Sequence, residues 1–191
     1  MSDFSRFPAP VDDGAAVGIE GKRLPAIELP STSGSHVDLA RVTGTLVLYV
    51  YPHATGTPDM PAPGWAEIPG AIGCTAESCA FRDREASFQS LGASVMGLSA
   101  QSTEAQGQFA ALKNITFPLL SDPDLKLSID PGLPTFQAGD LHLYRRLTLV
   151  AESGRIVKVF YPVFPPDTHP AEVLSWLQSH RDLGKRSSPA R

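Results

Sequence analysis

The sequence predicts an α/β domain with a central mixed sheet flanked by helices, and three observations support this fold class. Residues 45–51 form a continuous run of apolar, β-favouring side chains, which is typical of a strand covered on both faces. Helical and extended segments then alternate along the chain, which favours parallel strands. Near the end, two predicted strands at 143–150 and 156–161 are joined by a tight turn at 152–155, which adds an antiparallel pair.

Prolines, glycines and helix-capping residues locate the other elements. Residues 24–30 predict a short edge segment, because the prolines within it cannot donate to a sheet. A helix is expected from Cys74 to about Leu91, since Gly92 is well suited to end it. The remaining segments, in order, are a strand at 93–99, a helix capped by Ser102 or Thr103 that runs to about 113, a short extended segment at 117–120 and a last helix at 170–180. This order fits a thioredoxin-like sheet.

The chain divides into one domain with two short extensions. Residues 1–16 are predicted to be a flexible lead-in, residues 17–183 the domain, and residues 184–191 a disordered tail. Within the domain, residues 53–72 form a long loop rich in proline and glycine, and such loops are usually functional or mobile. With Trp65 as its apolar anchor, this loop is either a lid or partner surface, or a tolerated surface loop.

Composition narrows the classes of function. The 191-residue chain has a formal net charge of −4, which argues against an electrostatic nucleic-acid binder. No apolar run reaches the roughly 18 residues of a membrane span, and the N-terminus lacks the basic and apolar regions of a secretory signal. We therefore expect a cytoplasmic protein.

The only two cysteines are Cys74 and Cys79. Two are too few for a disulfide scaffold, and in a reducing compartment a close pair is more often redox-active than structural. The alternative is that they are small, buried core residues without chemistry. A metal site is not expected, because the five histidines are scattered at 36, 53, 142, 169 and 180.

The position of Cys74 favours a nucleophilic thiolate. It follows Gly73 at the start of the predicted helix, where free N–H groups and the helix dipole stabilise an anion, and Thr75 offers a hydroxyl. This position predicts a lowered pKa for the Cys74 thiol. In an intact helix the Cα atoms of Cys74 and Cys79 would lie roughly 8–9 Å apart. A disulfide needs about 4.4–6.8 Å, so the first turn would have to unwind.

The segment around the cysteines resembles a known family. Residues 73–83 read G-C-T-A-E-S-C-A-F-R-D and are similar to the G-C-T-x-E-x-C-x-F-R-D segment of peroxiredoxin Q, also called bacterioferritin comigratory protein. Residues 91–99, the F-P-L-L-S-D at 117–122 and the R-x-[ST] at 146–148 extend the resemblance. It covers roughly residues 18 to 180.

The resemblance implies a thioredoxin fold and the reduction of hydrogen peroxide and organic hydroperoxides, recycled by a thioredoxin- or glutaredoxin-type reductant. It implies no metal, haem or flavin cofactor. Cys74 would be the peroxidatic cysteine, Cys79 the resolving cysteine, and Arg146 the strand arginine that holds the thiolate. Arg145 is a rival, but strand alternation turns the two to opposite faces and the R-x-[ST] register favours Arg146.

The substrate-binding residues implied by the resemblance are Pro52, Gly73 and Thr75, and here the chain departs from the family. The family pattern P-x-x-x-[TS]-x-x-C is interrupted by about 15 extra residues between Pro52 and Cys74. Thr55 and Thr57 lie near Pro52, but neither is in register, and the sequence leaves open whether either supplies the missing hydroxyl.

Two other functions remain open at this point. One is a thiol redox sensor with slow turnover. The other is a thioredoxin-fold interaction module that uses the Trp65 loop and the aromatic segment 160–164, which could also pack under the loop or form a dimer contact. A monomer or weak homodimer is expected.

Overall fold

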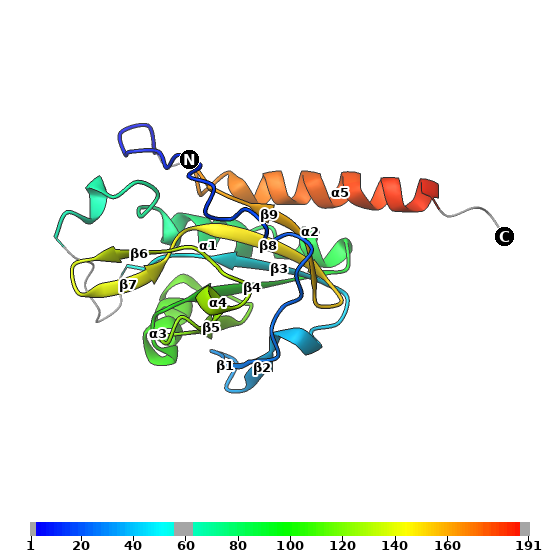
Figure 1. The fold of residues 1–191 in the computed structure, drawn as a ribbon, viewed down its shortest axis with the longest axis horizontal. Helices are drawn as coiled ribbons and strands as arrows, with labels where there is room; N and C mark the ends of the chain where they lie inside the picture. The colour runs from blue at the N-terminus through cyan, green and yellow to red at the C-terminus, as the bar shows by residue number, and fades with distance from the viewer. Residues whose placement is uncertain (1–2, 56–62, 188–191) are drawn as a thin grey trace.

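The computed structural model describes residues 3–55 and 63–187, and its centre is a five-stranded mixed sheet (Figure 1). The strand order is β5-β4-β3-β8-β9, with β3–β4 and β4–β5 parallel and β3–β8 and β8–β9 antiparallel. The bounds are β3 Thr45–Val50, β4 Ala93–Ser99, β5 Leu119–Ser121, β8 Leu147–Glu152 and β9 Arg155–Phe160. The predicted α/β fold class with a central mixed sheet is confirmed.

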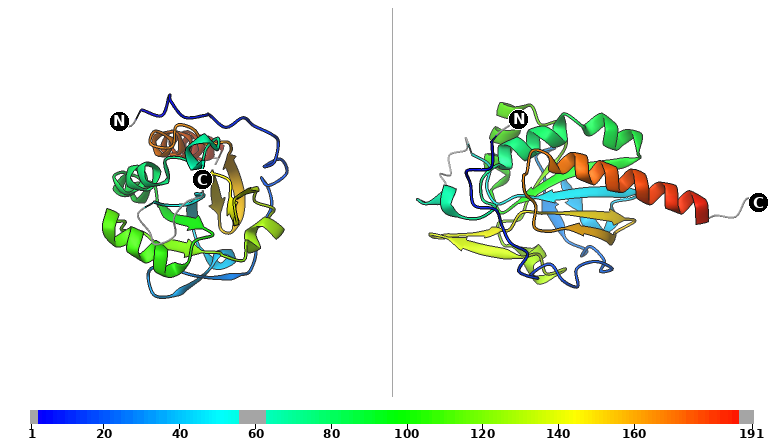
Figure 2. Two further views of the ribbon diagram at one scale, coloured as in Figure 1. Left: turned by 90° about the vertical axis from the view of Figure 1, so that its left-hand side faces the viewer. Right: turned by 90° about the horizontal axis from the view of Figure 1, so that it is seen from above.

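Helices and two small ribbons surround this sheet (Figure 2). The α-helices are α1 Cys74–Arg82, α2 Glu85–Ser90, α3 Thr103–Lys113, α4 Lys126–Ile129 and α5 His169–Ser187, and the 3-10 helices are η1 Leu39–Arg41 and η2 Trp65–Glu67. The ribbons pair β1 Glu28–Pro30 with β2 His36–Asp38, and β6 Thr135–Ala138 with β7 Leu141–Tyr144. Ser102 caps α3 as predicted, since its hydroxyl accepts from Ala105 N at 3.2 Å.

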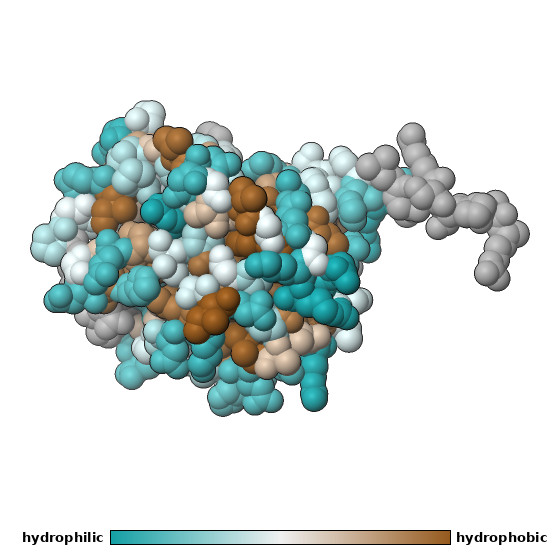
Figure 3. All heavy atoms as spheres, in the orientation of Figure 1, coloured by the Kyte–Doolittle hydropathy of each residue, from teal (hydrophilic) through white to brown (hydrophobic). Residues whose placement is uncertain are grey.

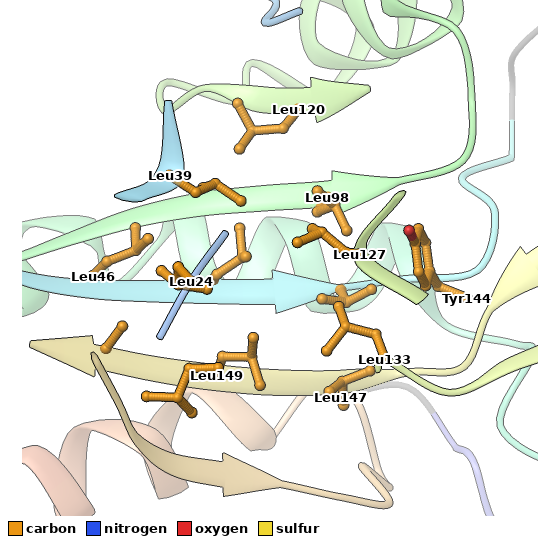
Figure 4. Close-up of a cluster of buried hydrophobic side chains, with 14 of the residues drawn as sticks. Leu24, Leu39, Leu46, Leu98, Leu120, Leu127, Leu133, Tyr144, Leu147 and Leu149 are labelled. Atoms are coloured by element: carbon orange, nitrogen blue, oxygen red, sulfur yellow. The ribbon is translucent and has the colours of Figure 1, made fainter. Parts of the chain in front are cut away.

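The two faces of β3 belong to different hydrophobic clusters. Leu46 and Leu48 pack into the cluster drawn in Figure 4, which also contains Leu24 and Leu127. Tyr49 and its neighbours at odd positions pack into a second cluster with side chains of α1, α2 and α5. This alternation explains why residues 45–51 are apolar throughout: both faces of the strand are covered.

Tyr49 fixes α1 to the central strand. Its ring stacks on Phe81 with a centroid distance of 4.5 Å and an interplanar angle of 17°. Its hydroxyl donates a hydrogen bond to Ser78 Oγ at 3.0 Å, and all three residues are buried. The start of α1, at Cys74, is thereby held near the segment that follows β3.

Two predicted elements are interrupted in the structure. The helix expected over 74–91 is divided into α1 and α2, because Arg84 leaves the helical conformation at φ −114°. The strand expected over 143–150 is divided into β7 and β8, with Arg145 and Arg146 between them. β7 leaves the main sheet to pair with β6, a strand that sequence reasoning missed.

The ends of the chain also differ from expectation. Residues 3–16, expected to be a flexible lead-in, run along the domain in Figure 2, and Phe4 within them is 6% exposed. Residues 184–187, expected to begin a disordered tail, continue α5. The rest of the predicted tail, residues 188–191, lies outside the described residues.

The described part of the 53–72 loop is anchored to the domain by a few buried side chains, although its other residues are largely exposed. Trp65 is 7% exposed and joins Ala138 and Leu143 in a small cluster on the β6–β7 ribbon. Phe160, from the aromatic segment 160–164 considered as an interaction surface, is also buried and packs edge-on against His169 of α5. The face shown in Figure 3 carries apolar residues among hydrophilic ones. Among the described residues, no helix has the length and apolar character to cross a membrane.

Gly97 provides a test of the packing between β3 and β4. A Cβ at this position would lie 2.6 Å from Leu119 Cδ2 and 2.7 Å from the Tyr49 hydroxyl. We expect Gly97→Ala to lower the free energy of unfolding by about 1–3 kcal/mol through overpacking. Urea unfolding would measure this change.

Gly107→Ala is the matched control, because a Cβ there meets nothing within 4 Å and the residue lies inside α3. It should stabilise the protein by up to about 1 kcal/mol through helix propensity. Equal effects of the two substitutions would contradict the packing described for Gly97.

Candidate active site

Gly73 sets the backbone that presents Cys74. It is the N-cap residue of α1 with φ 107°, a conformation that favours glycine. A Cβ on Gly73 would lie 2.3 Å from Pro166 Cγ and 2.9 Å from Phe4 Cε1, so no larger residue fits without movement. The enclosed turn leaves Cys74, the first residue of α1, only 3% exposed.

Arg146 reaches Cys74 from the break between β7 and β8. Its Nη2 donates to Cys74 Sγ at 3.1 Å. The same guanidinium donates to three successive carbonyls of the segment before Cys74: Gly70 O at 3.2 Å from Nε, and Ala71 O and Ile72 O at 3.3 Å each from Nη2. The side chain is 2% exposed.

The neighbouring Arg145 points elsewhere. Its guanidinium lies 3.9 Å from Asp13 Oδ2 and its side chain is 39% exposed. The choice of Arg146 over Arg145 therefore agrees with the geometry, although the two residues lie in a strand break and not in a continuous strand as expected.

Glu77 is a site residue that sequence reasoning missed. It is fully buried, its carboxylate pairs with Arg146 Nη1, and its Oε1 has no hydrogen-bond partner among the described residues. Its backbone N–H donates to Gly73 O at 2.9 Å. A signal was present: Glu77 lies three residues after Cys74, and residues three apart share one face of a helix.

The predicted lowering of the Cys74 pKa is wrong for this structure. Burial raises the pKa of the Cys74 thiol, because the anionic form loses its hydration. The charge of Arg146 and a backbone hydrogen bond from His53 act in the opposite direction, and the Glu77 carboxylate raises the pKa further. The position at a helix start was read correctly, but the depth of burial could not be read from the sequence.

Glu77 itself titrates near neutrality. Burial raises the pKa of its carboxyl to about 7, against the lowering effect of Arg146. When Glu77 is protonated, the Arg146 charge is no longer neutralised by a carboxylate and acts more fully on the sulfur. The charge on Cys74 is therefore linked to the protonation of Glu77.

Cys74 forms part of the wall of an open hollow of about 620 Å³. Gly73, Thr75 and Cys79 line the same hollow, so three of the predicted site residues join Cys74 there. Thr55 also lines it, and its Oγ1 lies 3.3 Å from Thr75 Oγ1. Of the two threonines left open by the sequence, Thr55 lies beside Thr75 in the hollow, while Thr57 lies outside the described residues.

Pro52 is not part of this hollow. It lines a separate, smaller cavity together with Gly70 and Arg146. Its predicted contact with substrate is thus not supported by the geometry; the residue lies on the guanidinium side of the site.

Both cysteines are free thiols in this structure. Cys79 belongs to α1 like Cys74 and is partly exposed. Because both lie in one intact helix, a bond between them requires the first turn of α1 to open. Among the described residues, no cluster of three or more His, Cys, Asp or Glu side chains could hold a metal ion.

Comparisons with known proteins show the family of the chain. Residues 19–174 match the Redoxin family model. The chain is 33% identical over 162 residues to the chloroplastic peroxiredoxin Q of Suaeda salsa, covering 84% of this chain and 68% of that protein. For the peroxiredoxin Q of Sedum lineare the identity is 34%, with 84% and 78% covered.

The chain belongs to the peroxiredoxin Q family. It is therefore a thiol-dependent peroxidase of thioredoxin-like fold. Solved structures of similar proteins include the peroxidoxin BcpB of Mycobacterium tuberculosis, with a TM-score of 0.67 and 27% identity over 84% of this chain and 96% of that one. Another is the Xanthomonas campestris bacterioferritin comigratory protein, with a TM-score of 0.65, 25% identity, and 82% and 96% covered.

Replacing Glu77 tests the charge balance of this peroxiredoxin site. In a Cys79→Ser background, we expect Glu77→Gln to lower the pKa of the Cys74 thiol, because the amide keeps the shape of the side chain but removes the negative charge. The pH dependence of alkylation of Cys74 by iodoacetamide would measure the shift.

Glu67→Gln is the matched control, since Glu67 lies in the exposed part of η2 and undergoes the same chemical change. It should leave the pKa of Cys74 where it was. If Glu77→Gln instead raised this pKa, the main role of Glu77 would be to hold Arg146 in place and not to oppose the thiolate.

Proposed function

We propose that this peroxiredoxin reduces hydroperoxides with Cys74 as the peroxidatic residue, Cys79 as the resolving residue and Arg146 as the activating cation. The observation that carries the proposal is the 3.1 Å contact between Arg146 Nη2 and Cys74 Sγ at the start of a helix. A buried guanidinium is always charged, so it favours the thiolate and any negative charge that develops beside it.

In the first step, the Cys74 thiolate attacks the terminal oxygen of the hydroperoxide. The S–O bond forms as the O–O bond breaks, and the leaving alkoxide or hydroxide takes a proton to become an alcohol or water. Sulfur is oxidised to a sulfenic acid and the peroxide is reduced. The paired hydroxyls of Thr55 and Thr75 line the hollow and are donors available there to a peroxide oxygen, while Arg146 acts on the Cys74 sulfur from behind the wall of the hollow.

In the second step, the thiol of Cys79 attacks the sulfenic sulfur of Cys74. A disulfide forms and water leaves. Because the two residues are five positions apart in α1, the first turn must unwind before this step. The contacts of Gly73 with Phe4 and Pro166 would have to loosen with it.

In the third step, an external dithiol of the thioredoxin or glutaredoxin type reduces the disulfide by exchange and is itself oxidised. A thiol reductant follows from the family, and its identity is part of this proposal. The expected cytoplasmic location and the monomer or weak homodimer stay predictions; the plant relatives named above are chloroplastic.

One observation favours slow turnover, as in a thiol redox sensor. The raised pKa of Cys74 leaves less thiolate at neutral pH than a typical reactive cysteine has. The interaction-module alternative loses its main support, because Trp65 and Phe160 are buried in the domain.

Cysteine substitutions test the assigned roles. In a peroxide-consumption assay coupled to thioredoxin, Cys74→Ser should reduce turnover by about a thousandfold or more, because it removes the nucleophile. Cys79→Ser should still consume one equivalent of peroxide per chain but lose sustained turnover, because the sulfenic acid is not resolved.

Mass spectrometry of the oxidised chains provides the control. The wild type should lose two hydrogens as the disulfide, and Cys79→Ser should gain one oxygen at Cys74. Sustained turnover by Cys74→Ser at the wild-type rate would contradict the proposal. A rate constant far below that of an efficient peroxidase, with both products as expected, would favour the sensor.

A further inference from the structure

The N-terminal arm, residues 3–13, precedes the part of the chain that matches the Redoxin family model. Contacts with the domain nevertheless hold the arm in place. Near its end, Asp13 accepts a hydrogen bond from the Tyr161 hydroxyl at 2.8 Å. Midway, Pro10 lies against Gly70, where an added Cβ would come within 3.3 Å of the proline ring.

The start of the arm reaches the active site. Phe4 is 6% exposed, packs edge-on against Phe164 with a centroid distance of 6.2 Å, and lies against Gly73. Phe7 is half-buried, with its ring centroid 6.3 Å from that of Phe4. Both rings line the hollow that contains Cys74, and Trp65 of the 53–72 loop lines it too.

The hollow is larger than the smallest substrate needs. At about 620 Å³ it lies within the range of pockets that bind small organic molecules, roughly 300–1,000 Å³. Hydrogen peroxide is little larger than a water molecule and has no apolar surface, so it gains nothing from aromatic walls. A hydroperoxide with an apolar body would bury that body against them.

The charged side chains that line the hollow do not favour a substrate that carries an ionic group. Asp3 and Arg6 of the arm both line it, and their charges are opposite. Asp3 is held by Ser5, whose hydroxyl donates to it at 2.6 Å. The features left to discriminate between substrates are therefore the aromatic surfaces.

We propose that the N-terminal arm is a substrate-selectivity element, in which Phe4 and Phe7 favour neutral hydroperoxides with a bulky apolar body over hydrogen peroxide. This inference rests on the proposed function of Cys74. The phenyl rings bind the body of the substrate while its terminal oxygen faces the sulfur, so burial of apolar surface contributes to kcat/KM for the bulky substrate alone.

The test compares kcat/KM for cumene hydroperoxide and for hydrogen peroxide in the wild type, Phe4→Ala and Phe7→Ala. Loss of the half-buried Phe7 ring should lower the ratio of the cumene hydroperoxide value to the hydrogen peroxide value about tenfold, and loss of Phe4, which is 6% exposed and offers less free surface, should lower it less. Val11→Ala is the matched control, because Val11 belongs to the arm, is 83% exposed and does not line the hollow. Its ratio should equal that of the wild type.

A second measurement does not depend on turnover. Binding of cumyl alcohol, the product of cumene hydroperoxide reduction, to the Cys74→Ser chain is followed by titration calorimetry. The affinity for cumyl alcohol should fall about tenfold when Phe7→Ala is added. Phe7 is chosen because it is less buried than Phe4, so its loss is less of a threat to folding.

A ratio within twofold of the wild type in both phenylalanine variants would overturn the inference but leave the proposed peroxidase intact. Unchanged binding of cumyl alcohol would overturn it as well. Failure of the wild type to consume either peroxide would overturn the proposed function, and the inference with it.

Discussion

The buried guanidinium of Arg146 is the group on which the rest of the site depends. It donates hydrogen bonds to the sulfur of Cys74 and to the three carbonyl oxygens of residues 70–72, and it pairs with the carboxylate of Glu77. One side chain thus joins the main sheet, the segment that precedes the catalytic helix and the helix itself. A buried charge is tolerable only when it is paired and hydrogen-bonded, and these contacts meet that requirement.

The same burial shapes the chemistry. It raises the pKa of Cys74 and brings the pKa of Glu77 to about 7, so the thiolate and the carboxylate compete for the one guanidinium. It also sets a conformational demand, because Cys74 must leave this enclosure to meet Cys79. The enclosed site suits the attack of Cys74 on the peroxide, but it has to open before the disulfide can form. The arm that carries Phe4 packs on Gly73, in the turn that has to open.

Much of the fold and the reactive pair could be predicted from the sequence. The central strand, the cap of α3 and the helix start at Cys74 follow from local patterns, and the family resemblance singled out Arg146. Long-range packing could not be predicted: the pairing of β7 with β6, the burial that raises the Cys74 pKa and the docking of Phe4 all depend on partners distant in the sequence. Thr55 was out of register for the family motif, and only the path of the chain brings it beside Thr75.

The most direct measurement of the central claim is kcat/KM for hydrogen peroxide in Arg146→Lys, compared with Arg145→Lys. Lysine keeps the charge but cannot reach the sulfur and the carbonyls at once, so the value for Arg146→Lys should fall about a hundredfold or more. Arg145→Lys, the same change at the neighbouring residue that points to Asp13, should stay within twofold of the wild type. A value for Arg146→Lys within threefold of the wild type would contradict the account, because the guanidinium would then not be the group that activates Cys74.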